Sequence, residues 1–328
     1  MMEVIIRTDA SIAIGSGHLM RCLTIAKQLQ MKGCYVRFYM KELPGHLIHY
    51  VEQQGFQNVK EMQKADLCII DHYEIDKEWE SSIRSFVKKI LVIDDLANRL
   101  HDCDMLLDQN IVPNFGGRYD GLVPKSCLKL LGPQNLIMRE EFIQARSQIE
   151  NRSGKVKRLL IFMGGTDPTS ETLKVLQALE QSNTNFEHID VVVGNGNIHK
   201  EKIDEICLIK GYSYHCQVNY MAELMIKADF SIGAGGSATW ERCYVGLPSS
   251  STIVAENQRD STKMAAQLGA VWNLGWYEDV QIHGYTALLN ELPQNKNRLK
   301  ELSQTGLSMT TSGSEPNPWL KKILEMMK

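Results

Sequence analysis

The sequence has 328 residues, more than a single hydrophobic core usually serves, and its length therefore predicts two domains. A formal net charge of −3 gives no reason to expect nucleic acid as a partner, and the lack of an apolar run of about 20 residues argues against an integral membrane protein. The N-terminal residues lack a basic region followed by an apolar one, so no signal peptide is expected. The eight cysteines form no Cys-x-x-Cys pair, which favours reduced thiols in a cytoplasmic protein over a disulfide framework or a zinc site.

The first motif is an apolar run at 4–6, predicted to be a buried strand, followed by a glycine-containing loop. Gly15 and Gly17 lie on either side of a serine, and His18 stands where apolar residues take up helical spacing. Glycine lets a backbone approach a ligand closely, and the unpaired N–H groups of a first helical turn favour an anion. The loop therefore predicts a ligand site with His18 at its mouth. The alternative is a capping histidine in an ordinary strand-loop-helix turn.

The first half of the chain alternates strands with helices, a pattern typical of a parallel sheet with crossover helices. Polar clusters follow three predicted strands, at the sheet edge where ligands bind open α/β folds: Asp71-His72-Tyr73, Asp94-Asp95 and Asp108-Gln109-Asn110. Each cluster alone is typical of a solvated loop, but together they predict a shared pocket beside His18. The predicted strands lie at 35–40, 67–70, 90–93 and 106–107, and the predicted helices at 47–54 and 77–88.

The segment 111–132 is rich in proline, glycine and asparagine and is predicted to be irregular. A helix is predicted at 140–149, and the polar residues at 153–158 are the predicted domain boundary. The predicted domains are 1–152 and 153–312, with a last helix within 313–328. Trp319 and Ile323 share one apolar face of that helix.

The second half begins again with a strand, a glycine loop and a helix start. A buried strand at 159–163 opens into Gly164-Gly165-Thr166-Asp167, a loop that suits a phosphate or a polar ligand bound by the backbone. Gly165 and Thr166 are therefore candidate binding residues. Further strands are predicted at 189–193 and 212–218.

A third glycine loop, residues 233–237, ends the predicted strand 230–232 and leads into a helix. The backbone amides of Gly235, Gly236 and Ser237, with the hydroxyls of Ser237 and Thr239, are suited to surround a diphosphate. Glu241, one turn into that helix, is suited to accept hydrogen bonds from both hydroxyls of a ribose. A dinucleotide fingerprint is disfavoured at the first loop because Met20, not glycine, fills its third position, and no P-loop is present.

Two successive Rossmann-like halves resemble the GT-B architecture of nucleotide-sugar enzymes. The pattern from Asp229 to Pro248 resembles the N-acetylglucosaminyltransferase that makes lipid II. The whole chain resembles the UDP-2,4-diacetamido-2,4,6-trideoxy-β-L-altropyranose hydrolases of pseudaminic acid biosynthesis and their spore-coat polysaccharide relatives. The matching segments are 7–11, 14–22, 69–73, 94–95, 108–110, 138–142, 163–167, the loop at 233–237 and Asn257-Gln258.

This resemblance implies two Rossmann-like α/β domains whose parallel sheets face each other across a cleft, with the last helix packed back on the first domain. It implies that water attacks the anomeric carbon with inversion, without a metal or cofactor, and that UDP is released. His18 falls on the general base of the family, and Tyr73 matches a sugar contact. The resemblance also places Asn257 and Gln258 near the sugar and diphosphate, and Val218 where backbone groups meet uracil.

The residues themselves agree with this chemistry. A neutral imidazole at His18 can take a proton from water, an effect worth about 10²–10⁴-fold in rate. Amides at 235–237 can stabilise the leaving diphosphate more than the ground state. Either Asp9 or Asp95 is expected to orient the imidazole, and the sequence does not decide between them.

The candidate site has one catalytic residue, His18, and no metal ligand. The alternatives are a GT-B glycosyltransferase that uses an acceptor in place of water and a non-catalytic nucleotide-sugar binding protein. The expected partners are a UDP-sugar, water and the product UDP, with no nucleic acid, membrane or obligate protein partner. The predicted substrate-binding residues are Gly15, Gly17, Arg21, Asp71, Tyr73, Asp95, Asn110, Gly165, Thr166, Val218, Gly235, Gly236, Ser237, Thr239, Glu241, Asn257 and Gln258.

Overall fold

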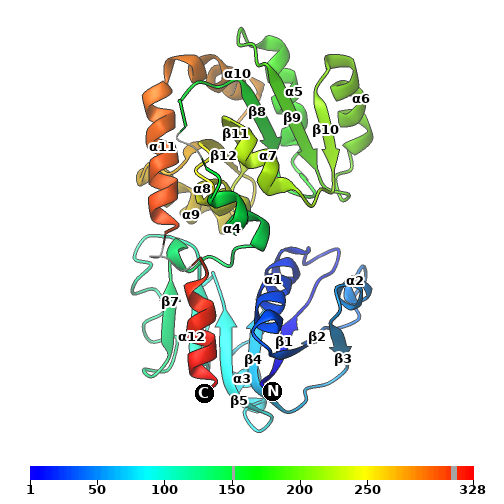
Figure 1. The fold of residues 1–328 in the computed structure, drawn as a ribbon, viewed down its shortest axis with the longest axis vertical. Helices are drawn as coiled ribbons and strands as arrows, with labels where there is room; N and C mark the ends of the chain where they lie inside the picture. The colour runs from blue at the N-terminus through cyan, green and yellow to red at the C-terminus, as the bar shows by residue number, and fades with distance from the viewer. Residues whose placement is uncertain (150–151, 312–315) are drawn as a thin grey trace. The chain divides into compact units, whose positions relative to one another are not determined.

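The computed structural model describes residues 1–149, 152–311 and 316–328, and it forms two α/β units (Figure 1). Unit 1 comprises Met1–Asn110, Asn114–Met138 and the C-terminal segment, and unit 2 comprises Ile111–Pro113 and Arg139–Thr311. Each unit contains one parallel sheet, which confirms the predicted fold class of two Rossmann-like α/β halves. The chain passes from unit 1 to unit 2 at 138–139, not at the predicted boundary of 152–153. The predicted boundary at 312–313 lies outside the described residues.

In the described residues, the sheet of unit 1 has seven strands in the order β3-β2-β1-β4-β5-β6-β7. Its inner strand β1 is buried on both faces, and Val4, Ile5 and Ile6 have no exposed surface, as expected for a strand inside a covered parallel sheet. The strand order changes direction between β1 and β4, so the loops after these two strands flank the position where such sheets bind ligands. The strands are β1 (Glu3–Thr8), β2 (Tyr35–Tyr39), β3 (Gln57–Val59), β4 (Ala65–Asp71), β5 (Val87–Ile93), β6 (Met105–Asp108) and β7 (Leu128–Leu131), and the helices are α1 (Gly17–Met31), α2 (Ile48–Gln53), α3 (Lys77–Ser82) and α12 (Pro318–Met326).

Two predictions for unit 1 are wrong in detail. The helix expected at 77–88 ends at Ser82, because Ile83 and Val87 both enter the core and Val87 already begins β5. The segment 111–132, expected to be irregular, contains the whole of the short strand β7 (Leu128–Leu131), which pairs with β6 at the edge of the sheet. Strands of three or four residues such as β3 and β7 carry too little apolar pattern to be seen in a sequence.

The helix α12 packs beside α1 against the core of unit 1 (Figure 1). Trp319 and Ile323 have no exposed surface, and the indole Nε1 of Trp319 donates a hydrogen bond to the carbonyl of Leu136 at 2.9 Å. The indole therefore combines apolar burial with a satisfied polar group, the arrangement that a buried tryptophan needs.

Trp319→Ala is expected to lower the free energy of unfolding by about 3–5 kcal/mol, because it leaves a large cavity in the core of unit 1. Urea denaturation followed by circular dichroism measures this loss. Lys321→Ala, on the exposed face of the same helix, is the control and should change the free energy by less than about 0.5 kcal/mol. A loss below about 1 kcal/mol for Trp319→Ala would contradict the packing described here.

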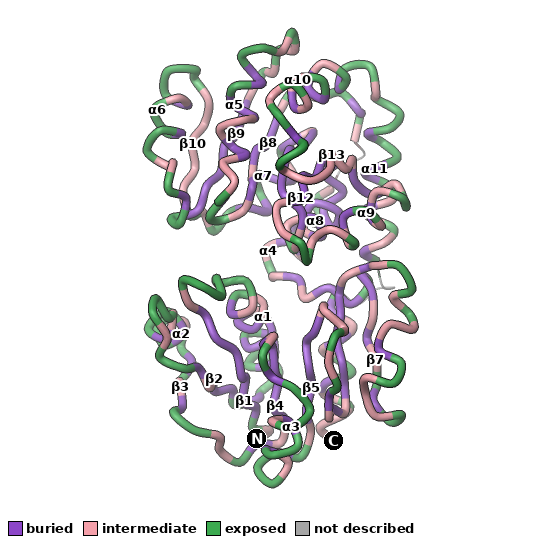
Figure 2. Tube along the Cα trace, turned by 180° about the vertical axis from the view of Figure 1, so that it is seen from behind, coloured by how far each residue is buried: buried purple, intermediate pink, exposed green. Residues whose placement is uncertain are grey.

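The sheet of unit 2 has six strands in the described residues, in the order β10-β9-β8-β11-β12-β13. The order changes direction between β8 and β11, so the loops after these strands again flank the ligand-binding edge. Figure 2 shows buried strands inside each unit and exposed residues mainly on loops and outer helix faces. The strands are β8 (Arg158–Phe162), β9 (His188–Val193), β10 (Ser213–Cys216), β11 (Phe230–Ala234), β12 (Ser249–Ile253) and β13 (Trp272–Trp276), and the helices are α4 (Glu140–Arg146), α5 (Glu171–Gln181), α6 (Lys200–Lys210), α7 (Met221–Lys227), α8 (Ser237–Tyr244), α9 (Arg259–Gln267), α10 (Ile282–Glu291) and α11 (Lys296–Met309).

The helix α4 explains why the boundary differs from the prediction. Arg139, just before α4, forms an ion pair with Glu241 of α8 at 2.9 Å. Arg146, at the end of α4, donates a hydrogen bond to the carbonyl of Tyr244 and stacks over its ring. These contacts join α4 to unit 2, although the polar segment that resembles a linker lies after α4. No helix in the described ranges is both long and apolar enough to cross a bilayer.

Candidate active site

The loop between β1 and α1 places His18 at the carboxyl edge of the sheet of unit 1. Gly15 has a φ of 80°, a left-handed conformation that side chains disfavour, and α1 starts at Gly17. The imidazole of His18 is only 11 % exposed, and its Nδ1 lies 2.5 Å from Oδ1 of Asp71, the last residue of β4. The two loops that follow β1 and β4 therefore meet at one histidine–carboxylate pair.

Asp71 is completely buried and is also held by Arg21, one turn further along α1. Arg21 donates from Nε to Oδ2 at 2.8 Å and from Nη2 to Oδ1 at 2.7 Å. Burial alone would raise the pKa of Asp71, but the charge of Arg21 and the hydrogen bond from His18 outweigh it and hold this pKa well below its usual range. An ionised carboxylate only accepts hydrogen bonds, so the proton of a neutral His18 ring sits on Nδ1 and Nε2 is left as the acceptor.

The residue that orients His18 is therefore Asp71, and neither of the two candidates from the sequence takes this position. Asp9 lies in a separate buried cluster, where both oxygens accept from Arg7 at 2.7 Å and Oδ2 lies 3.1 Å from Nε2 of His72. Asp95 lies nearer to the site, but its Oδ2 faces Nη1 of Arg21 at 3.8 Å. Asp71, predicted to contact substrate, has no exposed side-chain surface and supports the histidine instead.

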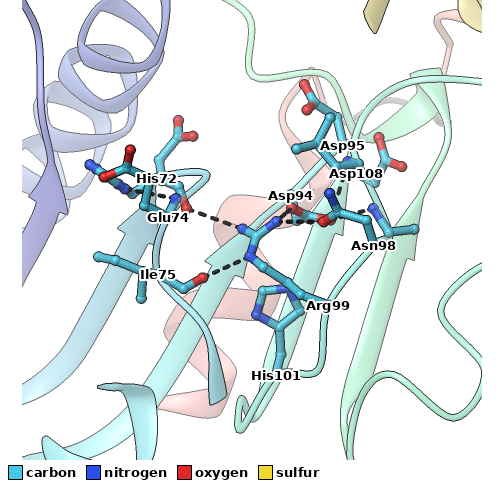
Figure 3. A network of polar contacts seen from close by, with 12 residues as sticks. His72, Glu74, Ile75, Asp94, Asp95, Asn98, Arg99, His101 and Asp108 are labelled. Carbon is cyan, nitrogen blue, oxygen red and sulfur yellow. Dashed lines mark hydrogen bonds and ion pairs between the residues drawn. The ribbon is translucent and has the colours of Figure 1, made fainter. Parts of the chain in front are cut away.

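Tyr73 packs edge-on against the imidazole, with ring centroids 4.5 Å apart. The loop that carries it is held at both ends by Arg99, which donates to the carbonyl of His72 at 3.1 Å and to the carbonyl of Ile75 at 2.7 Å. The same guanidinium forms an ion pair with Asp94, after β5, at 2.7 Å (Figure 3). Sequence reasoning missed Arg99, because two of its partners are backbone carbonyls more than twenty residues earlier, which no motif marks.

A second carboxylate cluster lies after β5 and β6 on the same edge. Asp108 accepts from Arg118 at 2.8 Å. The Tyr119 hydroxyl lies 3.2 Å from Asp108 and 3.1 Å from Asp94, so the two carboxylates share its single proton. Burial raises the pKa of Asp108 to about 6 against the opposing effects of the Asn110 amide and Arg118. Asn110 is bound to this cluster through its backbone amide, which donates to Asp108 at 3.0 Å.

In unit 2, the third glycine loop leads from β11 into α8. Gly236 has a φ of 92°, and Ser237, the first residue of α8, is exposed with its backbone at the start of the helix. Gln258 lies against the loop: a Cβ on Gly235 would come within 3.0 Å of its Oε1, and this oxygen accepts from the amide of Val254 at 3.1 Å. Gly235, Gly236, Ser237 and Gln258 therefore lie together, and their binding of a diphosphate stays a prediction.

The remaining candidates in unit 2 lie after β8, within α8, and in the segments that follow β10 and β12. Gly165 and Thr166 are exposed after β8, and Gly194 packs so closely on Gly165 that a Cβ there would collide with its backbone. Thr239 is buried and accepts a hydrogen bond from Arg242 at 3.2 Å, so its hydroxyl belongs to the interior of the loop. Of the other three candidates, Glu241 lies in α8 and is paired with Arg139, Val218 is half-buried just beyond β10, and Asn257 is exposed beside Gln258.

Comparison with curated proteins gives three relatives at similar identity. The chain is 29 % identical over 280 residues to the UDP-2,4-diacetamido-2,4,6-trideoxy-β-L-altropyranose hydrolase of Campylobacter jejuni, covering 82 % of this chain and 97 % of that protein. It is 26 % identical over 289 residues to the spore coat polysaccharide biosynthesis protein SpsG of Bacillus subtilis, covering 84 % of each. It is also 27 % identical over 270 residues to the uncharacterized protein MJ1062 of Methanocaldococcus jannaschii, covering 75 % of this chain and about half, 54 %, of that protein.

Solved structures show the same fold at low sequence identity. MurG of Acinetobacter baumannii superposes with a TM-score of 0.67 at 13 % identity, and the glycotransferase of kitacinnamycin with a TM-score of 0.62 at 15 % identity. Each comparison covers 100 % of this chain and 99 % of the other. No protein-family model matches the sequence. The resemblance predicted from the sequence is confirmed: the chain has the GT-B fold, and its relatives include the altropyranose hydrolase and SpsG.

Proposed function

We propose that the protein hydrolyses a UDP-activated diacetamido-trideoxy hexose, UDP-2,4-diacetamido-2,4,6-trideoxy-β-L-altrose, to the free sugar and UDP. The observation that carries this proposal is the contact of His18 with the ionised, fully buried Asp71. A buried carboxylate on Nδ1 fixes the tautomer and leaves Nε2 as a base, as in other histidine-dependent hydrolytic sites. The similarity to the Campylobacter jejuni hydrolase supports the choice of substrate.

In the proposed reaction, His18 Nε2 takes a proton from water while the water oxygen bonds to the anomeric carbon. The bond from that carbon to the diphosphate breaks, the configuration is inverted, and UDP leaves as an anion. Backbone amides at the Gly235–Ser237 turn are proposed to hold the diphosphate and to stabilise the charge that develops on it. Tyr73, in contact with the imidazole, is the proposed sugar contact. No metal ion takes part in this scheme.

The test is incubation of the purified protein with the altrose nucleotide sugar in the absence of any acceptor. Release of UDP, followed by ³¹P NMR, together with an anomer of opposite configuration in the first ¹H spectra, is expected. UDP release that requires an added acceptor would replace the proposal with the glycosyltransferase alternative. Tight UDP-sugar binding with no turnover under either condition would replace it with the non-catalytic alternative.

A cytoplasmic location is part of the proposal. It is supported by the cysteines, all eight of which are free, seven of them buried. Cys103 and Cys127 lie with their sulfurs 3.5 Å apart and are not bonded to each other. Unpaired thiols in this number are typical of a reducing compartment.

A further inference from the structure

Arg242, in the helix α8, is a buried cation that lacks a counter-charge. Its side chain has no exposed surface, and only Nη2 finds acceptors: the carbonyl of Ala234 at 2.9 Å, Ser251 Oγ at 3.0 Å and Thr239 Oγ1 at 3.2 Å. Nε and Nη1 are buried without a hydrogen-bond partner. Within the part of the chain that the structure describes, no carboxylate lies within ion-pair distance, and the adjacent Glu241 is paired with Arg139.

Among the described residues, the two other buried arginines are paired with carboxylates. Arg7 is paired with Asp9 at 2.7 Å, and Arg37 with Glu3 at 2.6 Å. Taking an unpaired charge out of water costs several kcal/mol, so buried ions are normally matched by an ion of opposite sign. Burial lowers the pKa of Arg242 to about 10, which still leaves the guanidinium charged at neutral pH. The structure thus retains a costly positive charge in unit 2.

The position of this charge is specific. A Cβ on Gly233 would collide with Nη1 of Arg242, so glycine at 233 lets the guanidinium lie directly against the end of β11. Nη2 bonds to the last residue of β11 and to Thr239 in the first turn of α8. The guanidinium therefore lies under the turn formed by 235–237. The N-terminus of a helix already carries positive partial charge, so a second positive group there is unfavourable unless an anion binds outside the turn.

We propose that Arg242 is the buried counter-charge of a nucleoside diphosphate bound at the Gly235–Ser237 turn, acting through the turn without touching the ligand. This inference rests on the proposed function only for the identity of the anion. The amides of the turn contact the phosphates, and Arg242 supplies the net positive charge that neutral amides lack. Arg242 is therefore a positioning residue, and its effect scales with the charge of the ligand.

The experiment compares uridine, UMP and UDP binding by isothermal titration calorimetry to the wild-type protein and to Arg242→Met, which keeps the volume and removes the charge. UDP affinity is expected to fall about tenfold or more, UMP affinity by a smaller factor, and uridine affinity by less than about twofold. Arg242→Lys keeps the charge and should restore most of the UDP affinity. Arg158→Met is the matched control. This arginine is the first residue of β8, at the amino ends of the strands and away from the glycine turn, and it lies 3.6 Å from Asp190.

An equal loss of affinity for all three ligands would show a packing role and overturn the inference, and so would unchanged UDP binding. If Arg242→Met does not fold, Arg242→Gln removes the charge while its amide can still donate to the Ala234 carbonyl, and the same ratios apply. Failure of the wild-type protein to bind UDP would instead overturn the proposed function. UDP binding that depends on Arg242, in a protein that does not hydrolyse the UDP-sugar, would support the inference and refute the hydrolase.

Discussion

Replacing His18 with alanine is expected to lower kcat by about 10²–10⁴-fold and to leave the affinity for UDP within about twofold of wild type. The reason is that the imidazole removes a proton from the attacking water and contributes little to the binding of the nucleotide, whose proposed contacts lie in unit 2. His18→Gln is expected to behave in the same way, because glutamine can hydrogen-bond to Asp71 but cannot take up a proton at neutral pH.

Steady-state UDP release and calorimetric UDP binding measure the two quantities for His18→Ala. His49→Ala is the matched control, since His49 lies on α2 of the same unit with a side chain that is 82 % exposed. Wild-type turnover in His18→Ala would remove this residue from the mechanism. A parallel loss of kcat and UDP affinity would assign it to binding instead of proton transfer.

Asp71→Asn is the second substitution with a large expected effect. Asparagine has nearly the same shape but no charge, so it no longer stabilises the imidazolium that forms as water is deprotonated, nor does it impose the Nδ1–H tautomer. We expect kcat to fall by about 10²–10⁴-fold, with UDP affinity unchanged. ¹⁵N NMR of the histidines provides a readout that a purely structural role would not change: the Nδ1–H signature of His18 should be lost.

The same substitution should also lower stability, because Arg21 loses a buried ionic partner, at a cost of about 3–5 kcal/mol. The pKa of Asp71 is lower in the folded state than its unfolded value of about 3.9, so the carboxylate contributes its full stabilisation above roughly pH 4 and loses it as the pH falls through the folded pKa. The difference in free energy of unfolding between wild type and Asp71→Asn should therefore shrink as the pH falls below about 4.

Asp104→Asn is the control for these measurements. Asp104 forms an ion pair with Arg84 at 2.6 Å but precedes β6, so it lies at the edge of the sheet opposite to His18. It should keep wild-type turnover and the His18 tautomer. A difference between wild type and Asp71→Asn that grows as the pH falls below about 4 would contradict the assigned ionisation of Asp71.

The architecture was predictable because its signals are local. Apolar runs of four to six residues marked the central strands, and glycine loops after β1, β8 and β11 marked the ligand-binding edges. Composition and spacing could not place the domain boundary, because α4 is fixed to unit 2 by Arg139 and Arg146, whose partners lie about a hundred residues later. Contacts between residues so far apart produce no local residue pattern from which a domain boundary can be predicted.

The support of His18 was not predictable for a related reason. Asp9, Asp71 and Asp95 all end strands at one sheet edge, so sequence spacing does not distinguish them. The choice is made by the arginines: Arg7 stands two residues before Asp9, on the same face of an extended chain, and binds it with both terminal nitrogens. Arg21 reaches Asp71 from a helix and holds it beneath the imidazole. An arginine side chain is long and has several rotamers, so its carboxylate partner cannot be predicted from sequence spacing.

The contacts of Arg99 make the loop between His72 and Ile75 tolerant of changes in its side chains. Its guanidinium binds the main-chain carbonyls of His72 and Ile75, so the loop between them is anchored independently of the side chains at 73 and 74. Those two positions can be exchanged without loosening the ends of the loop or disturbing the Asp71 support. Under the proposed function, a substitution of Tyr73 changes the proposed sugar contact and the ring that packs on His18, while Arg99 keeps the backbone of the loop in place.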